Sequence, residues 1–508
     1  MKRIALLALL VLVSMVSGVF AQDAELTLTP LGTYATGIID DGGAEIVTYI
    51  PESQQLVVVN SGEGSQLDFI NISDPSAPTL VMSVDMTVYG GGANSVDYKN
   101  GIVAAGVEAE DTQAPGVVVF LSAEGEELAV VEVGALPDMV VFTPDGSKLL
   151  VAGEGEPSSD YTNDPEGTIA IIDVATFEAN LITFGDVTPA EGVRVFGPNA
   201  TAAQDFEPEY IAVSPDGTVA AVTLQENNAV AIVDVVAGTL VDVIPLGYKD
   251  HSLEANALDA NDEDGAINIQ AWPVMGMYLP DGIAAYEVDG EVYFITANEG
   301  DARDYDAFAE ESRLEDVTLD PEAFPNAAEL QAGDQLARLN VTTTQGDTDG
   351  DGDFDVLYNY GGRSFTVWNS AGELVYDSGS SIETITAELA PELFNSEGTA
   401  DGFDSRSDNK GPEPETVVIG TVNDVPYAFV ALERISGIIV YNISDPAAPT
   451  FAGYVSNTIA DGVMEEGTAG DIAPEGLKFI PATDSPTGNA LLAVANEVSG
   501  TTTVYEIQ

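Results

Sequence analysis

The sequence is poor in cysteine, histidine and basic residues. Its 508 residues include no Cys, one His, and 14 Lys and Arg residues beside 85 Asp and Glu residues. The lack of Cys excludes disulfides and a lipoprotein anchor, and together with the single His it argues against a zinc site. The formal net charge of −71 argues against nucleic acid or an anionic membrane surface as a partner. Metal cations are the natural counterions of such a chain.

The N-terminus has the pattern of a secretory signal peptide. Lys2 and Arg3 precede a short apolar stretch at residues 4–13, and small residues lead to an expected cleavage after Ala21. The apolar stretch is too short for a membrane span, and no other segment is long enough. We therefore expect residues 1–21 to be removed and the protein to be secreted or extracellular, or periplasmic if the source has an outer membrane.

One pattern recurs seven times along the chain. Each repeat has a polar, usually acidic, opening residue, a strand, a hairpin, a second strand and a Glu. The openings are Glu45, Asn94, Asp138, Glu209, Asp281, Glu415 and Glu475, and the second strands end at Glu63, Glu108, Glu154, Glu226, Glu299, Glu433 and Glu497. The two marks lie 14 to 22 residues apart, which is enough for two strands and a hairpin. A third apolar run usually follows.

Repeats of this kind predict an all-β fold, a seven-bladed β-propeller spanning residues 22–508. The strand expected within residues 24–37 would complete the last blade and remove its exposed edge. The repeat pattern is interrupted at residues 307–412, which predicts a long insertion between the fifth and sixth blades. In the fifth repeat, we expect the third strand in the sequence LARLNV (336–341).

The recurring acids predict a cation site at one mouth of the propeller. A first strand starts, and its returning partner ends, on the same face, so both sets of acids should converge there. Crowded carboxylates are costly without a cation, and Ca²⁺ suits a flexible shell of oxygen ligands. The alternatives are that these residues cap turns or pair with basic residues. The candidate ligands are Glu154, Glu209, Glu226, Glu299, Glu415, Glu433, Glu475 and Glu497.

An Asp-rich loop in the insertion is a second candidate calcium site. Carboxylates alternate at Asp347, Asp349, Asp351, Asp353 and Asp355, as in the first half of an EF-hand loop. The twelfth position is Tyr358 rather than Glu, so the motif is incomplete. The alternative is an acidic surface turn.

The few basic residues are predicted to lie at the same mouth. They are Arg303, Arg406, Lys410 and Arg434. They would either pair with the acidic residues or bind an anionic group such as phosphate beside a metal. The only histidine, His251, could act as a general base, but a lone loop histidine is more often structural.

Several long segments resemble the choice-of-anchor I family. They include TANEGDARDY (296–305), DSRSDNKGPEPE (404–415) and ALERISGIIVYNISDPAAP (431–449), and the likeness covers nearly the whole mature chain. The resemblance implies a secreted or surface propeller related to mesenchyme-specific cell-surface glycoproteins, which are associated with calcium carbonate deposition. Bacterial relatives are often labelled alkaline phosphatase or phytase-like esterase. The sequence ends at Gln508 without an anchoring segment, so we expect release or retention by other contacts.

The sequence therefore favours an exported calcium-binding propeller that acts as a binding or scaffold protein. The alternative is a calcium-dependent phosphoesterase, with Glu299 or Glu433 as base and the basic residues stabilising negative charge. Its ligands would be phosphorylated small molecules. A third hypothesis is an adhesion module for surface polysaccharide or protein. Its aromatic candidates are Trp272, Tyr278, Tyr358, Tyr360 and Trp368, residue types that more often lie in the core.

Overall fold

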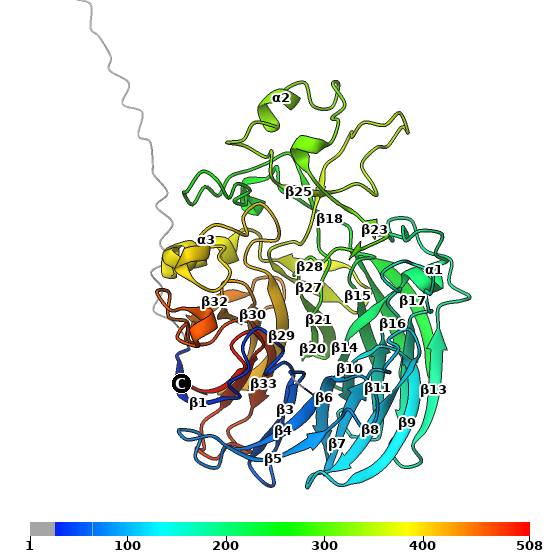
Figure 1. Ribbon diagram of the computed structural model, residues 1–508, viewed down its shortest axis with the longest axis vertical. Helices are drawn as coiled ribbons and strands as arrows, with labels where there is room; N and C mark the ends of the chain where they lie inside the picture. The colour runs from blue at the N-terminus through cyan, green and yellow to red at the C-terminus, as the bar shows by residue number, and fades with distance from the viewer. Residues whose placement is uncertain (1–25, 63) are drawn as a thin grey trace, which may run out of the picture.

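The fold is all-β and built mainly from four-stranded antiparallel sheets (Figure 1). The computed structural model describes residues 26–62 and 64–508. The predicted signal peptide and Glu63 therefore lie outside the described residues. The described residues form seven four-stranded sheets, which follow one another in chain order. Within the described part of the chain, no helix is long and apolar enough to cross a bilayer.

Each of the seven sheets is a simple run of neighbouring antiparallel strands. In chain order the sheets comprise β2 (Val47–Ile50), β3 (Gln55–Asn60), β4 (Gln66–Asn71) and β5 (Thr79–Asp85); β6 (Ala93–Lys99), β7 (Ile102–Val107), β8 (Pro115–Ser122) and β9 (Glu127–Ala135); β10 (Pro137–Phe142), β11 (Lys148–Gly153), β12 (Thr168–Asp173) and β13 (Glu178–Thr183); β14 (Pro208–Val213), β15 (Val219–Leu224), β16 (Ala229–Asp234) and β17 (Thr239–Pro245); β20 (Ile283–Val288), β21 (Glu291–Ala297), β27 (Phe365–Asn369) and β28 (Leu374–Asp377); β29 (Pro414–Val422), β30 (Val425–Leu432), β31 (Gly437–Asn442) and β32 (Thr450–Val455); and β33 (Pro474–Ile480), β34 (Leu491–Asn496), β35 (Thr501–Ile507) and β1 (Leu28–Ala35).

The middle strands of each sheet supply the core. In β15 and β16, runs such as AVAIV are buried on both faces, as expected for strands packed between neighbouring sheets. The hairpin before β15 turns at Asp216 and Gly217. Asp216 accepts a hydrogen bond from the Thr218 amide (3.1 Å), and Gly217 adopts a left-handed φ of 73°, which glycine tolerates without strain.

The first strands of the seven sheets contact one another in cyclic order: β2, β6, β10, β14, β20, β29, β33 and β2 again. All seven line a common central cavity of about 280 Å³. The N-terminal strand β1 pairs with β35 in the last sheet, with Leu28 opposite Ile507. The arrangement is propeller-like, and the pairing joins the two ends of the described chain.

The predicted position of the long insertion is wrong. The third strand of the fifth sheet is β27, and it pairs with β21 through Ile295 and Val367. The excursion therefore begins inside the fifth sheet, and residues 365–377 of the expected insertion belong to that sheet. The sequence LARLNV instead leads into β25 (Asn340–Thr342), outside the fifth sheet. Both segments are short apolar runs, so their periodicity could not distinguish them.

The segment between β21 and β27 and the loop between the fourth and fifth sheets together form a separate sheet. The loop between the fourth and fifth sheets supplies β18 (Tyr248–Asp250) and β19 (Met275–Met277), which assemble with β26 (Tyr358–Asn359), β25 and β24 (Glu311–Arg313). This five-stranded sheet lies at one end of the molecule (Figure 1). It has an apolar cluster of its own around Trp272 and Leu339. We call residues 248–278 and 298–364 the insertion region.

The remaining elements are short. A two-stranded ribbon consists of β22 (Asp304–Tyr305) and β23 (Phe308–Ala309). The α-helices are α1 (Ala202–Asp205), α2 (Ala327–Leu330) and α3 (Ser381–Leu389), and the 3₁₀ helices are η1 (Glu254–Asn256), η2 (Leu314–Asp316), η3 (Pro391–Leu393), η4 (Ala400–Gly402) and η5 (Met464–Glu466).

Candidate functional site: an acidic mouth with a basic rim

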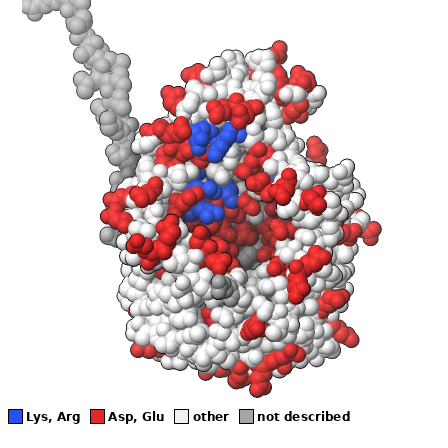
Figure 2. All heavy atoms as spheres, in the orientation of Figure 1, with Lys and Arg blue, Asp and Glu red and all other residues white. Residues whose placement is uncertain are grey.

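The opening residues of all seven repeats line one cavity of about 430 Å³ at the mouth of the central channel. Eleven of the residues that line it are acidic and none is Lys or Arg. Figure 2 shows acidic side chains gathered around a hollow, with basic side chains beside it. We call this space the acidic cavity. Its carboxylates belong to Glu45, Asp138, Glu154, Glu156, Glu209, Glu226, Asp281, Glu299, Asp301, Glu415 and Glu475.

β-Bulges place the opening acids in the cavity. The pairing register shifts between Pro137 and Met139, and between Pro474 and Leu477. The same shift flanks Glu209 and Glu415 in their strands. A bulge leaves an extra residue unpaired and re-aims its side chain. Asp138 is the extra residue in its strand, and Glu209, Glu415 and Glu475 each lie within the shifted stretch, in keeping with their place in the cavity lining.

A backbone hydrogen bond that recurs in three repeats fixes the position of the Glu that follows the second strand. The residue two positions before the opening acid has a left-handed φ at Leu136 (46°), Glu413 (48°) and Ala473 (58°). Its carbonyl accepts a hydrogen bond from the amide of the Glu that follows the second strand, over 2.8 to 2.9 Å. The donors are Glu154, Glu433 and Glu497. Such non-glycine conformations are strained and are retained where surrounding contacts hold them.

Burial raises the pKa values of several cavity carboxyls, and nearby carboxylates raise those of Asp138, Glu209 and Glu415 further. Desolvation is the largest cause for Glu45, Asp138 and Glu226, whose pKa values rise to about 7. The pKa of Glu415 lies well above its usual range because of burial and the charges of Glu299 and Glu475. Carboxyls that resist ionisation in this way would be stabilised in their charged form by a cation.

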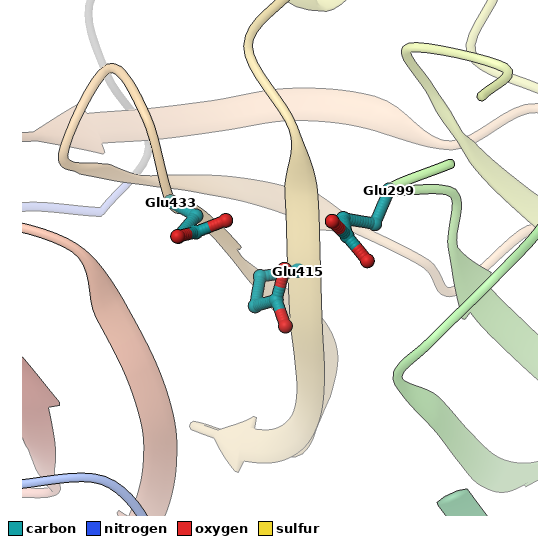
Figure 3. Close-up of side chains that lie close together, drawn as sticks. All are labelled: Glu299, Glu415 and Glu433. Atoms are coloured by element: carbon teal, nitrogen blue, oxygen red, sulfur yellow. The ribbon is translucent and has the colours of Figure 1, made fainter. Parts of the chain in front are cut away.

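Three glutamates converge on a single point of the mouth. Glu299 follows β21, Glu415 lies in β29 and Glu433 follows β30, and one carboxylate oxygen of each lies within 4.8 Å of the others. Figure 3 shows their side chains pointing toward one another. We call them the glutamate triad. Burial raises the pKa of Glu433 to about 8, although the Arg434 charge lowers it.

Several cavity oxygens have no hydrogen-bond donor among the described residues. They are Oε2 of Glu209, Glu226 and Glu415, and their residues are 6%, 7% and 7% exposed. A buried carboxylate oxygen without a partner is costly. These oxygens are cavity atoms that could act as ligands of a cation.

The basic residues form a rim beside the cavity and share one buried carboxylate. Glu413 contacts Arg406 at 2.6 Å, Lys410 at 3.3 Å and Arg434 at 3.2 Å. We call these three cations the basic rim. The charges of Lys410, Arg406 and Arg434 hold the pKa of Glu413 below its usual range, although burial acts in the opposite direction. The rim lines a second cavity of about 350 Å³.

Arg303 also lines this second cavity, but its guanidinium is buried and fully engaged. It contacts Asp205 at 2.5 Å and Glu207 at 3.0 Å, and it lies over the ring of Phe196 at 4.7 Å. These contacts correspond to the expected structural pairing. The prediction that Arg303 binds an anion stays untested.

The remaining sequence candidates lie outside the cavity lining. Glu497 acts electrostatically on Glu45 and Glu475 from the edge of the mouth. His251 is buried in the insertion region, where its Nδ1 lies 2.6 Å from the carbonyl oxygen of Asn256. Burial, and then the Lys249 charge, lowers its pKa well below the usual range. His251 therefore stays neutral.

The carboxylates of the Asp-rich loop fall into two groups, one exposed and one half-buried. Asp347, Asp349 and Asp351 approach one another, whereas Asp353 and Asp355 approach Asp320. The loop's own backbone supplies donors: Gly350 and Gly352 donate to Asp347 at 2.7 and 3.0 Å. Such bonds account for the loop's shape without a cation, and calcium binding there stays a prediction.

The structure adds acids that the repeat pattern did not identify. Glu156 and Asp301 line the cavity, each two residues beyond the Glu that ends a second strand. That shared offset is the signal that could have identified them. Of the aromatic candidates, only Tyr358 is partly exposed. The other four are buried, as expected for core residues: Trp272, Tyr278, Tyr360 and Trp368.

Comparison with known proteins gives matches of three kinds. The model of the choice-of-anchor I domain matches residues 45–446. Gigasin-3a of Magallana gigas is 34% identical over 190 residues, covering 34% of this chain and 65% of the relative. The mesenchyme-specific cell surface glycoprotein of Strongylocentrotus purpuratus is 26% identical over 288 residues, covering 49% of this chain and 36% of the relative. The chain thus spans less than two thirds of each relative's length.

Solved structures that are similar at low sequence identity include the following two. Kuenenia stuttgartiensis hydrazine synthase matches with a TM-score of 0.48 and 13% identity, covering 93% of this chain and 99% of the other. The Neurospora crassa Pan2 WD40 domain matches with a TM-score of 0.46 and 10% identity, covering 96% of both chains. These values are too low to carry a functional argument.

Proposed function

Because the chain belongs to the choice-of-anchor I domain family, we propose that it is an extracellular, calcium-binding, seven-bladed β-propeller that acts as a binding or scaffold protein. The observation that carries the proposal is the acidic cavity. Eleven carboxylates line it without a Lys or Arg, and three of their buried oxygens have no donor among the described residues. A cation bound there would offset the repulsion and desolvation of these groups.

Calcium fits the donor set better than other common metals. Ca²⁺ takes six to eight oxygen ligands in a flexible shell, whereas Mg²⁺ demands a tight octahedron. Carboxylates on separate repeats, such as Glu209 and Glu415, supply oxygens from several directions. Zinc favours Cys and His ligands, and the chain has no Cys and a single His, which is buried away from the cavity lining.

An extracellular setting agrees with the family and with the relatives. One relative is named a cell surface glycoprotein, and a binding or scaffold role at or outside the cell surface is consistent with that name. Extracellular calcium-binding modules have dissociation constants of about 10⁻⁴–10⁻³ M, in keeping with the concentrations around them. We therefore expect millimolar calcium to occupy the mouth.

Calorimetric titration of calcium into chelator-treated protein tests the proposal. Wild type should bind calcium and bind magnesium more weakly. Glu415→Gln should weaken calcium binding by about tenfold or more, because it removes one charge and one ligand oxygen from the triad. Glu291→Gln, which changes an exposed carboxylate of β21, is the matched control and should bind like wild type. Absence of calcium binding to wild type would refute the proposal.

The second candidate is a calcium-dependent phosphoesterase. The observation that favours it is the basic rim, because its cavity shares Glu156, Glu226 and Asp301 with the acidic cavity. A metal could activate water there while the rim stabilises negative charge. A panel of phosphate esters tests this candidate. Hydrolysis should rise with calcium and vanish in Glu299→Gln, and inactivity across the panel would eliminate it.

A further inference from the structure

We propose that the basic rim becomes an oxyanion site when a cation occupies the glutamate triad. In this account the mouth binds a cation and an oxyanion side by side, and each strengthens the binding of the other. The oxyanion is of the phosphate or carboxylate type. The proposal rests on the proposed function, because it requires calcium at the triad, and it adds the ligand class that the mouth recognises.

The rim cations share one carboxylate, and two of them, Lys410 and Arg434, also pair with triad members. Glu413 is fully buried and serves all three cations. The remaining buried partners are triad members: Lys410 contacts Glu299 at 2.6 Å, and Arg434 contacts Glu433 at 3.2 Å. The other partners are exposed: Asp301 (side chain 55% exposed) for Lys410 and Glu397 (58%) for Arg406.

A metal ion at the triad would compete with the rim for the same carboxylates. The three oxygens that define the triad lie within 4.8 Å of one another. Glu415 is only 7% exposed, and its Oε2 has no hydrogen-bond donor among the described residues. Calcium bound by Glu299 and Glu433 would neutralise the charges that now balance Lys410 and Arg434. The rim would then carry more positive charge than Glu413 can balance, and unbalanced buried charge is costly.

The cavity beside the rim has room for the compensating anion. Its volume is about 350 Å³, and its lining includes Arg406, Asn409, Lys410 and Arg434 together with Arg303 and five acidic residues. Guanidinium donors match the oxygens of a phosphate or carboxylate, and withdrawal of Glu433 toward a cation would leave Nη2 of Arg434 for such an oxygen. Because this cavity shares three lining residues with the acidic cavity, an oxyanion at the rim would lie close to the cation.

The test measures binding of methylphosphonate, a soluble and non-hydrolysable phosphate analogue, by calorimetry with chelator and with calcium. Calcium should raise methylphosphonate affinity by about tenfold or more, and linkage requires that methylphosphonate raise calcium affinity by the same factor. Acetate in place of methylphosphonate distinguishes the two sources of oxyanion: equal coupling indicates a carboxylate-tolerant site, and coupling with methylphosphonate alone indicates a phosphate site.

Two outcomes separate this inference from the proposed function. If calcium binds but the affinity for both anions is the same with chelator and with calcium, the inference is wrong and the calcium proposal stands. If calcium itself does not bind, both are wrong.

Rim variants locate the anion. Arg406→Gln should remove most of the coupling between calcium and methylphosphonate, and Arg406→Lys should keep part of it because the charge remains. Arg434→Gln provides a second variant. Because the Arg434 side chain is 34% exposed, this substitution should destabilise the fold less than Arg406→Gln. Arg338→Gln is the control, because Arg338 pairs with Asp262 and Asp408 and does not line the cavity beside the rim. Full coupling in both rim Gln variants would place the anion elsewhere and overturn the inference.

Discussion

Glu413 and Glu415 lie two residues apart, and both are buried, yet they belong to opposite electrostatic regions. Glu413 faces the basic rim, where three cations lower its pKa. Glu415 faces the acidic cavity, where burial and neighbouring carboxylates raise its pKa well above the usual range. Burial is the same, so the local charge balance decides whether a carboxylate is a structural anion or a group that needs a cation.

The Asp-rich loop completes the comparison. Its carboxylates are as crowded as those of the mouth, but water screens exposed charges. Asp347 and Asp355 also accept hydrogen bonds from their own loop. Acidic crowding therefore has its largest energetic consequence where carboxylates are buried and lack cations. We expect the effects of substitution on stability to decrease from the basic rim to the acidic cavity and then to the Asp-rich loop.

The largest effect is expected at the rim. Glu413→Gln leaves three cations without their shared buried anion, and removing one partner of a buried ion pair costs about 3–5 kcal/mol. Chemical denaturation of chelator-treated protein should show this loss. Glu291→Gln, on the exposed surface, should leave stability unchanged. A loss below about 1 kcal/mol would mean that the rim cations are balanced by other groups.

The same substitution at Glu415 should have the opposite sign. In chelator, Glu415→Gln removes a desolvated acid from a cluster of like charges, so the free energy of unfolding should rise by about 1 kcal/mol or more. In calcium, the variant should lose most of the stabilisation that wild type gains. Denaturation curves with and without calcium measure both effects. Destabilisation in chelator would contradict the proposed charge imbalance.

Stability without metal should fall as pH rises from the ordinary range of Glu toward about 8. The pKa of Glu433 rises on folding from 4.5 to about 8, so the folded state holds more protons than the unfolded state in this interval. Stability therefore decreases with pH there and levels off above it. Calcium should reduce or reverse the slope by replacing protons. Calorimetric melting curves in chelator that do not change across this interval would show that Glu433 titrates normally.

The smallest effect is expected at the Asp-rich loop. Asp351→Asn changes an exposed carboxylate of the loop, so stability in chelator should change by less than about 0.5 kcal/mol. The melting temperature gained on adding calcium should also stay close to that of wild type. Loss of that gain would move the dominant calcium site from the mouth to the loop.

The repeats and their opening acids could be predicted because strand alternation and turn signals recur locally in the sequence. The continuation of the fifth sheet could not, because β27 pairs with β21 only after a long excursion between Ala297 and Phe365. The union of two excursions in one five-stranded sheet likewise depends on tertiary pairing.

The mouth could be predicted in outline but not in its internal division. Matched repeat positions brought the acids to one face, whereas bulges and left-handed residues, which give no clear sequence signal, direct them into the cavity. The separate characters of Glu413 and Glu415 could not be read from the sequence. They arise because the fold brings Arg406, Lys410 and Arg434 to one side of the strand only.

The most direct test is anomalous diffraction from crystals grown in millimolar calcium. The account predicts an anomalous peak at the glutamate triad, with oxygens of Glu299, Glu415 and Glu433 at about 2.3–2.6 Å, the usual calcium–oxygen distance. A triad without such a peak, in crystals where calcium is present at that concentration, would contradict it.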